Sequence, residues 1–471
     1  MKKALLILLL ACSSCVKVGP NFRPPCAPLQ DSWQQQVGVE APDEQWWENL
    51  HDPGLNLLVE RALLQNLSLK EAAWRILQAR YELGIAVGQF FPQLQQGEGT
   101  IESVRRSRNA PNTGLGDLDF TSYRLGLTVA WELDFWGRFR RGIEAAQDQV
   151  FATYANYDDV QVLLISEVAS TYTALRTIQK RIAILEGNIK IQERSLDIVD
   201  ARWQAGLVTE LDVQQAKTLL ESTRARLPQL LIDREAALNG LAVLLGVTPE
   251  EIPCYLSLEG DIPKSPDLVE AGLPCALVMR RPDLRRALNE LAAQSALIGV
   301  AYSDLFPHVF IGGTIGVESS GGASFTRSGS GGSLLSAPSF TYILGPSFAW
   351  QIWNYGRLEN RVRAEYAVFY RLVARYQNSV LAAYRDVENS LTAFIEAEQQ
   401  EIVLKRSVEA AQRAADLANA QYVEGIQDYT RVLQTLEALL NAQEALVGSQ
   451  GAVTQGYIAS YRALGVGAPK N

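Results

Sequence analysis

The feature that most constrains this chain is an internal repeat, because a tryptophan-led motif occurs twice at a fixed distance. Residues 131–138 read WELDFWGR and residues 350–357 read WQIWNYGR, so the offset is 350 − 131 = 219. The same offset continues downstream and joins Glu167 to Asp386, Gly206 to Gly425 and Gly246 to Gly465. An offset that holds over more than a hundred residues predicts two tandem copies of one long unit.

An earlier pair of Phe-Pro steps has a slightly different offset, since Phe91-Pro92 returns as Phe306-Pro307 and 306 − 91 = 215. The segment between these steps and the tryptophan motif therefore differs in length between the copies. The expected organisation is two halves of one structure. The predicted boundaries are a signal peptide at 1–11, a lipidated extended strap at 12–45, a first repeat at 46–246, a connector at 247–280 and a second repeat at 281–471.

Composition and charge exclude several classes of function. The formal net charge is −9 and no run of lysine or arginine exists, which argues against a nucleic-acid partner. No apolar run of about 20 residues is present, so no membrane-spanning helix is expected. The chain has no GxxxxGKS/T nucleotide motif, no GxSxG motif and no Cys or His grouping with metal spacing. We therefore expect no catalytic residue, no metal and no cofactor.

The N-terminus has the pattern of an export signal. Lys2 and Lys3 precede a short apolar core at residues 4–10, and the core ends in Leu-Leu-Ala-Cys12. This ending resembles a bacterial lipobox, which makes Cys12 the expected lipidated first residue. Cys15 is the alternative lipidation position, favoured by the length of the signal. The other alternative is an ordinary signal peptide with incidental cysteines. In an exported chain, Cys254 and Cys275 of the connector are compatible both with a disulfide and with two free thiols.

The segment at residues 53–89 is predicted to be an amphipathic helix. Asp52 followed by Pro53 is a typical helix start, and apolar residues then recur at helical spacing. Asn66 near the middle is expected to mark a break. The Phe91-Pro92 step ends the helical pattern.

Four strands are expected from alternation with a period of two. The clearest runs from Tyr123 to Leu133, with an apolar face, an aromatic residue near each end and a polar opposite face. The same face recurs from Tyr342 to Ile352, and weaker strand patterns lie at 93–106 and 309–317. A membrane barrel strand needs this pattern, although a soluble sheet with one buried face shows it too. Four strands cannot close a membrane barrel, so several chains must contribute if these strands span a membrane.

Long helices are expected to fill the remainder of each repeat. Proline is absent between Pro111 and Pro228 and again between Pro346 and Pro469, which leaves room for helices of about 45 to 65 residues. A 3.5-residue spacing typical of coiled coils starts at Val213 and recurs at the same offset. The two predicted seams are Val213, Ala216, Leu220, Thr223 and Leu227, and Val432, Thr435, Leu439, Ala442 and Leu446. Pro228 interrupts only the first copy, and a kink is expected there.

The turns between the long helices carry the most specific polar pattern. In the first copy Gly206 is expected to end one helix, with Thr209 as the cap of the next and Asp212 at the capping-box position. In the second copy Gly425 and Asp428 have the same roles. Well-formed hairpin turns account for this pattern on their own, so a function at the tips needs a further argument.

Taken together, these motifs resemble the TolC-like outer-membrane efflux proteins, in particular the lipoprotein branch often called NodT-type. The resemblance covers nearly the whole mature chain. It rests on the VGPNFRP segment at 18–24, Trp46-Trp47, the tryptophan motif at 131–138, the two glycine turns and RRPDL at 280–284.

The resemblance implies a fold that is mainly α with membrane β. A long antiparallel α-helical coiled-coil barrel would continue a twelve-stranded outer-membrane barrel, to which each chain of a homotrimer gives four strands. The protein would be lipid-anchored in the bacterial outer membrane with a long periplasmic extension, and the connector would lie at its waist. It would serve as a passive exit duct for small toxic compounds in a tripartite efflux system.

The resemblance also implies that the periplasmic tips hold the gate and meet the adaptor protein of an inner-membrane pump. The tip residues are Gly206, Leu207, Thr209, Asp212, Gly425, Asp428 and Arg431. The family often narrows its aperture with acidic residues, but Arg431 stands where the first copy has Asp212, so the charges here are mixed. The alternatives are a protein-secretion duct on the same scaffold and a non-conducting, lipid-anchored envelope scaffold.

Overall fold

The computed structural model describes residues 17–30, 32–35, 37–38, 40–109, 118–256, 260–320 and 334–467. Cys12 and Cys15, the two predicted lipidation positions, lie outside the described residues. The chain divides into two compact units. The first unit comprises residues 1–25, 76–152 and 287–375, and the second comprises residues 26–75, 153–286 and 376–471.

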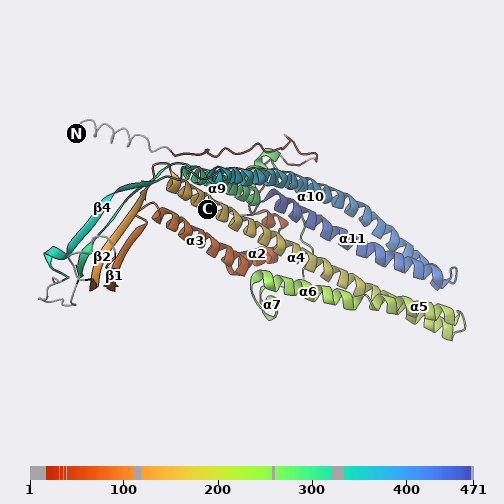
Figure 1. Ribbon diagram of the computed structural model, residues 1–471. Coiled ribbons are helices and arrows are strands. Elements are labelled where there is room, and N and C mark those ends of the chain that lie inside the picture. The colour runs from red at the N-terminus through yellow and green to blue at the C-terminus, as the bar shows by residue number, and fades with distance from the viewer. Residues whose placement is uncertain are drawn as a thin grey trace. The chain divides into compact units, whose positions relative to one another are not determined.

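The elements follow one another as two similar series (Figure 1). The first series is η1 (Trp46–Leu50), α2 (Pro53–Gln65), α3 (Leu67–Gly88), β1 (Leu94–Arg105), β2 (Asp119–Leu133), α4 (Arg138–Gln204), α5 (Glu210–Arg224) and α6 (Leu227–Leu245). The connector holds η2 (Pro249–Glu251), α7 (Ile252–Tyr255), η3 (Pro274–Ala276) and α8 (Leu277–Arg280). The second series is α9 (Pro282–Ser303), β3 (His308–Ser320), η4 (Ala337–Ser339), β4 (Phe340–Ala349), α10 (Arg357–Val423) and α11 (Tyr429–Leu464).

The first unit holds a four-stranded antiparallel sheet in the order β1-β2-β3-β4 (Figure 1). Its register places Leu127 opposite Gly97 on one side and opposite Ile315 on the other. Because side chains alternate between the faces of a strand, this register gathers the apolar positions on one face. Leu125, Leu127, Ile315, Leu344 and Phe348 of that face are exposed. The four predicted strands are confirmed, although β4 ends at Ala349 and the expected strand to Ile352 was too long.

The opposite face of the sheet is polar. Arg124 of β2 and Glu318 of β3 are Cα partners, and their side chains form an ion pair at 3.1 Å. Among the described residues, β1 and β4 each pair on one side only. Unpaired strand edges of this length are rare in fully assembled proteins, because they offer free backbone donors and acceptors to other chains.

The two long helices match in length to the residue. Both α4 and α10 have 67 residues, slightly more than expected, and their first residues differ by 357 − 138 = 219. Gly142 and Gly187 lie inside α4, so neither of these glycines ends the helix. The shorter helices α3 and α9 both have 22 residues and differ by 282 − 67 = 215. The internal duplication predicted from the two sequence offsets is therefore confirmed.

The duplication extends to single hydrogen bonds. In the first unit Trp131 donates from Nε1 to the Phe90 carbonyl at 3.1 Å, and Trp350 donates to the Leu305 carbonyl at 3.1 Å. In the second unit Asn66 donates to the Leu244 carbonyl at 2.8 Å, and its equivalent Arg281 donates to the Ala463 carbonyl at 2.7 Å. Asn66 also separates α2 from α3, as predicted, because its Oδ1 caps the amide of Leu69.

The helical hairpins differ at one point. The first returns as two helices, α5 and α6, with Pro228 in the first turn of α6, so the predicted interruption is confirmed. The second returns as one helix, α11, of 36 residues. The predicted seam of the first copy is buried from Val213 to Thr223. The seam of α11 was partly wrong, because Leu436, Leu440 and Val447 are buried there whereas Thr435, Ala442 and Leu446 are half-buried.

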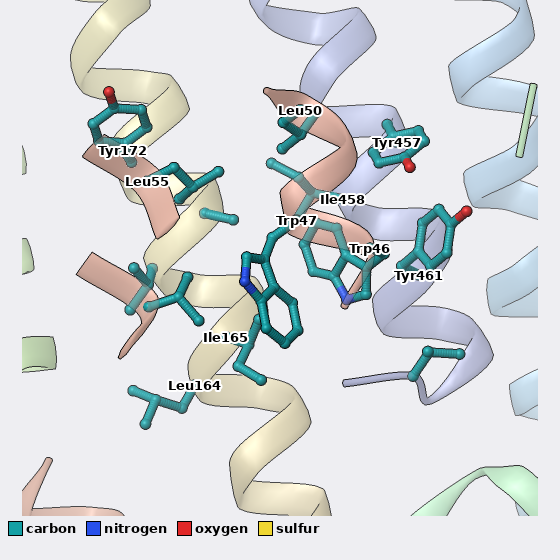
Figure 2. Packing of buried hydrophobic residues seen from close by; sticks show 14 of the residues in the cluster. Trp46, Trp47, Leu50, Leu55, Leu164, Ile165, Tyr172, Tyr457, Ile458 and Tyr461 are labelled. Atoms are coloured by element: carbon teal, nitrogen blue, oxygen red, sulfur yellow. The ribbon is translucent and has the colours of Figure 1, made fainter. Parts of the chain in front are cut away.

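The main core of the second unit surrounds Trp46 of η1 (Figure 2). Its ring is fully buried and stacks on Tyr461 of α11 with centroids 5.4 Å apart. Asp52 caps α2 by accepting from the amides of Gly54 and Leu55, and the Tyr172 hydroxyl donates to the same carboxylate at 2.8 Å. The residues before α2 therefore join two helices in one core, because Trp46 contacts α11 and Asp52 contacts α4.

Cys254 and Cys275 of the connector are both free and exposed, so the disulfide alternative is not formed. His308 contacts Glu132, with Nδ1 and Oε1 separated by 2.6 Å. Among the described residues, no helix is both long enough and apolar enough to cross a membrane.

Candidate functional site

The candidate site consists of the two turns at the ends of the helical hairpins, both in the second unit. In the first turn Gly206 has φ of +74°, and the amide of Leu207 donates back to the Arg202 carbonyl at 2.9 Å. The left-handed conformation favours glycine, and this bond closes the last turn of α4. Asp212 then accepts from the amide and the hydroxyl of Thr209, both at 3.0 Å.

The second turn repeats this backbone geometry with different capping residues. Gly425 has φ of +79°, and the amide of Ile426 donates to the Gln421 carbonyl at 2.9 Å. Asp428 takes the capping position and accepts from the amide of Arg431 at 3.1 Å. The first carboxylate therefore closes a capping box with Thr209, whereas the second acts directly as the cap.

The hairpins are joined near the tips by an arginine. Arg202 of α4 donates from Nη1 to the Tyr422 carbonyl at 2.6 Å and to the Val423 carbonyl at 3.2 Å. Its guanidinium also lies over the Tyr422 ring, 4.8 Å from the centroid. The last carbonyls of a helix carry partial negative charge, so a cation stabilises the end of α10 at this place.

Behind the arginine lies an aromatic pair. Tyr422 and Tyr429 have ring centroids 5.1 Å apart, and the Tyr429 hydroxyl lies 3.0 Å from Oγ of Ser195. Burial raises the pKa of both phenols, so they are neutral at physiological pH. The Tyr422 hydroxyl is buried and has no hydrogen-bond partner among the described residues. A buried hydroxyl without a partner destabilises the arrangement that contains it, by about 1–3 kcal/mol.

The outer surface of the tips carries both apolar and charged side chains. Leu207, Leu211 and Ile426 are exposed, and none of them contributes to the tip core. Glu210, Glu424, Asp428 and Arg431 are exposed there too, three acidic residues and one basic residue. The expected mixture of signs is therefore present at this surface.

All seven predicted tip residues lie in these two turns. Sequence reasoning missed Arg202, Tyr422 and Tyr429, which make the contact between the hairpins. The sequence did contain a signal for this contact. Arg202 lies shortly before Gly206, and Tyr422 lies shortly before Gly425, in otherwise similar segments. Among the described residues, no group of His, Cys, Asp and Glu could hold a metal ion.

A family model described as outer membrane efflux protein matches residues 58–247 and 273–466. The chain belongs to the outer membrane efflux protein family. The match falls into two segments because the family domain is itself in two parts, one for each repeat.

Members of this family from Pseudomonas putida align with nearly the whole chain. The chain is 30% identical over 471 residues to the pyoverdine export outer membrane protein OpmQ, covering 98% of this chain and 95% of that protein. It is 30% identical over 468 residues to the toluene efflux pump outer membrane protein TtgI, covering 95% of this chain and 94% of that protein.

Solved structures of outer membrane efflux proteins have the same fold. The outer-membrane channel OprN superposes with a TM-score of 0.86 at 31% identity, covering 96% of this chain and 99% of that chain. The Campylobacter jejuni CmeC outer membrane channel has a TM-score of 0.88 at 23% identity and covers 97% and 96%. The chain is therefore the outer-membrane channel of an efflux pump in the bacterial outer membrane, and the family is not enzymatic.

Proposed function

We propose that three copies of this chain close a twelve-stranded barrel in the outer membrane. Two observations support this. Each chain has four strands, fewer than the roughly eight that a membrane barrel needs, and β1 and β4 keep free edges among the described residues. The apolar face of the sheet is exposed in the single chain, which suits contact with lipid rather than water.

We propose that the tips form the gate of the duct. The observation that carries this proposal is the bond from Arg202 to the Tyr422 carbonyl, which holds α4 of one hairpin to the end of α10. Separation of the two hairpins at the tips would break this contact. The unpartnered Tyr422 hydroxyl supports the same reading, because a second arrangement can satisfy it.

The adaptor protein of the pump is proposed to dock on the exposed tip residues. Leu207, Leu211 and Ile426 offer apolar area at the turns, and the exposed charges around them are mainly acidic, with Arg431 as the basic residue. Apolar side chains with a polar rim are typical of a protein interface. The carboxylates Asp212 and Asp428 act first as helix caps, so a simple acidic ring is not part of the proposal.

The N-terminal segment is proposed to lead from a lipid anchor at Cys12, with Cys15 as the alternative. The support lies downstream, where Arg141 of α4 is 1% exposed and binds the chain that follows the anchor. It donates to the carbonyls of Val18 and Gly19, both at 3.1 Å, and to Oδ1 of Asn21 at 3.0 Å. A buried cation with this many bonds to one extended segment fixes that segment on the helix.

The two repeats are proposed to form equivalent halves of the duct wall, with boundaries at 46–246 and 281–471 and the connector at 247–280. The cargo is proposed to be small organic compounds. The support for this cargo comes from two similar proteins, one a toluene efflux pump component and one a pyoverdine exporter.

The gate is tested by measuring conductance of the purified protein in planar bilayers. Arg202→Ala should raise the open probability, because it removes the bond between the hairpins. The exposed Arg413→Ala on α10 is the matched control and should conduct like the wild type. Equal open probability in Arg202→Ala and the wild type would contradict a role of this contact in gating.

Docking is tested by changes that leave the barrel untouched. Gly425→Pro removes an amide that donates to the Tyr422 carbonyl and forces φ from +79° to a negative value. Asp428→Arg removes a helix cap and reverses the charge. Both variants should lose export of a toxic solute while the mass of the assembled particle stays that of the wild type. Normal export by both variants would show that the tip assignment is wrong.

A further inference from the structure

An exposed apolar segment follows the last strand of the first unit. Ile352, Trp353 and Tyr355 lie between β4 and α10, and the Tyr355 side chain is 99% exposed. Tyr355 also has φ of +52°, a left-handed conformation that is unfavourable for a tyrosine. Such strain is kept where the surroundings require it. Because the ring touches almost nothing in its own chain, those surroundings are missing from the single copy.

The equivalent segment of the first repeat has its surroundings. Trp136 is the counterpart of Tyr355, since 355 − 136 = 219, and it contacts the second repeat of the same chain. Its ring stacks on Phe306 with centroids 4.6 Å apart, and its Nε1 donates to the Pro307 carbonyl at 2.9 Å. We call this contact, together with the β2–β3 pairing, the internal joint. It connects the end of the first repeat to the start of the second.

The start of the first repeat has the complementary half of such a joint. Phe91 is the counterpart of Phe306 at the offset of 215, and its side chain is 57% exposed. The single chain therefore contains one filled joint, Trp136 with Phe306, and two unfilled halves, Tyr355 at one end and Phe91 at the other. The two halves lie beside β4 and β1, which each pair on one side only within the described part of the chain.

The helices next to the joint differ in the same way. Ala296 of α9 is 2% exposed, whereas its counterpart Tyr81 of α3 is 66% exposed. Gly299 of α9 packs so tightly that an added Cβ would lie 2.8 Å from Nε of Arg141, whereas a Cβ on its counterpart Gly84 would meet nothing. The face that α9 buries is therefore the face that α3 leaves open.

We propose that the internal joint is repeated between neighbouring copies of this chain, so that Tyr355 and Ile352 of one copy meet Phe91 and Gln95 of the next. This inference rests on the proposed trimer and adds its residue contacts and strand register. A second copy is the occupant because it carries counterparts of both halves of the internal joint.

The strand register follows from the pairings inside the sheet. Gln95 faces Val129 and Val309 faces Phe348, and 348 − 129 = 219, so Gln95 and Val309 are counterparts. Leu133 faces Val309 in the internal joint, and the counterpart of Leu133 is Ile352. Ile352 of one copy therefore faces Gln95 of the next. Gln96, one residue further, points to the other face of the sheet.

The two joints differ in charge. In the internal joint, Arg138 of the first repeat lies 3.8 Å from Asp304 of the second, and Glu132 of the first contacts His308 of the second at 2.6 Å. The counterparts of the two carboxylates are amides, Gln89 for Asp304 and Gln351 for Glu132. The counterpart of Arg138 is Arg357, whose guanidinium donates to Oε1 of Gln351 in its own chain. The joint between copies therefore lacks both carboxylates of the internal joint and has no ion pair among these counterparts, so salt should affect it little.

Disulfide trapping in isolated outer membranes tests the register. The variant carries Gln95→Cys and Ile352→Cys, with Cys26, Cys254 and Cys275 changed to serine and the N-terminal cysteines kept. Directly opposed residues of antiparallel strands have Cβ atoms about 4.5–5.5 Å apart, close enough for a disulfide after small adjustment. Oxidation with copper phenanthroline should convert most of the protein to linked dimers and trimers on a non-reducing gel. The yield should be equal at low and high salt.

Matched controls separate the possible failures. Each single-cysteine variant and the pair Gln96→Cys with Ile352→Cys should stay monomeric on the gel. A second pair, Phe91→Cys with Tyr355→Cys, should link through a short bismaleimide. Equal linking of the Gln95 and Gln96 pairs, or a trimeric mass without linking in either predicted pair, would overturn the inference while the trimer stands. A monomeric mass in the unmodified protein would overturn the proposed trimer as well.

Discussion

The two helical hairpins derive from one repeat and differ in continuity. In the first hairpin the returning chain breaks after Arg224 and resumes at Leu227, whereas α11 runs unbroken through the equivalent positions. Their outer limits nevertheless agree, since α5 begins and α6 ends 219 residues before α11 does. The difference teaches that the repeat preserves where helices start and stop, set by caps and glycines, more strictly than it preserves an unbroken helix between them.

The largest expected effect comes from placing the break in the wrong hairpin. Val447 of α11 is the counterpart of Pro228 and is buried. Val447→Pro removes a helical hydrogen bond and clashes with the preceding turn, so it should destabilise the protein by about 3 kcal/mol or more. Guanidinium unfolding of the detergent-purified protein measures this loss. Pro228→Val is the matched control and should lower the free energy of unfolding far less. Equal losses in the two variants would show that the position of the break does not explain why the first hairpin tolerates a proline.

A second comparison uses the equivalent bonds of Asn66 and Arg281. Each donates to the last turn of the returning helix, so Asn66→Ala and Arg281→Ala should each cost about 2 kcal/mol. Burial alone would raise the pKa of Asp283, but the hydrogen bonds and charge of Arg281 outweigh it, and the pKa lies below its usual value. A carboxyl pKa that is lower in the folded state stabilises the protein at pH values above the unfolded-state pKa near 4. This stabilisation is lost as the pH falls through the folded-state pKa.

The cost of Arg281→Ala should therefore shrink on acidification to about pH 3, whereas the cost of Asn66→Ala should stay constant. Unfolding midpoints of both variants and the wild type at pH 7 and pH 3 give the two differences. A constant cost for Arg281→Ala would mean that its bond to the Ala463 carbonyl, rather than its pair with Asp283, supplies the stability.

A third comparison concerns a carboxylate that only the first repeat has. Burial first, and then the charge of Glu144, raise the pKa of Asp148 to about 6. The counterpart of Asp148 is Ala367. A raised carboxyl pKa means that ionisation opposes folding, so Asp148→Asn should stabilise the protein at pH 7 by about 1 kcal/mol after allowance for solvent screening. The gain should vanish as the pH falls from 6 to 4, and a gain that persists at pH 4 would contradict this cause.

The smallest expected effects are at the tip caps. Thr209→Ala breaks the capping box of the first turn, and Asp428→Ala removes the single cap of the second. Each should cost about 1 kcal/mol, confined to the first turn of the following helix. Hydrogen exchange of residues 210–213 and 429–432 measures this local loss. Faster exchange across whole hairpins in either variant would show that the caps stabilise more than their own turns.

The parts of the fold that depend on local chemistry could be predicted from the sequence. Alternation gave the four strands, and Gly206, Thr209 and Asp212 gave a turn whose bonds have the expected pattern. The predicted length of α4 was nearly right. The absence of proline indicates the extent of this helix better than the absence of glycine does, because α4 continues through Gly142 and Gly187. The repeat was the strongest signal, since a constant offset needs no knowledge of contacts.

The parts that depend on which faces meet could not be predicted. The seam of α11 was carried over from the first copy by the offset. It missed Leu436 because α11 buries Leu436 and Leu440 in addition to Val432 and Leu439, the equivalents of Val213 and Leu220. The contact of Arg202 with Tyr422 was missed because the residues are 220 positions apart and only packing brings them together. The free state of Cys254 and Cys275 likewise depends on distances that spacing does not contain.

The equal lengths of α4 and α10 limit how this protein can evolve. Each residue inserted into a helix lengthens it by about 1.5 Å and rotates everything beyond it by about 100°. An insertion in α4 alone would move Gly206 away from the level of Gly425 and turn Arg202 off the carbonyls that it binds. A longer duct therefore requires matched insertions in both repeats, in steps close to seven residues that restore the seam. In such a protein, the lengths of α4 and α10 must change together.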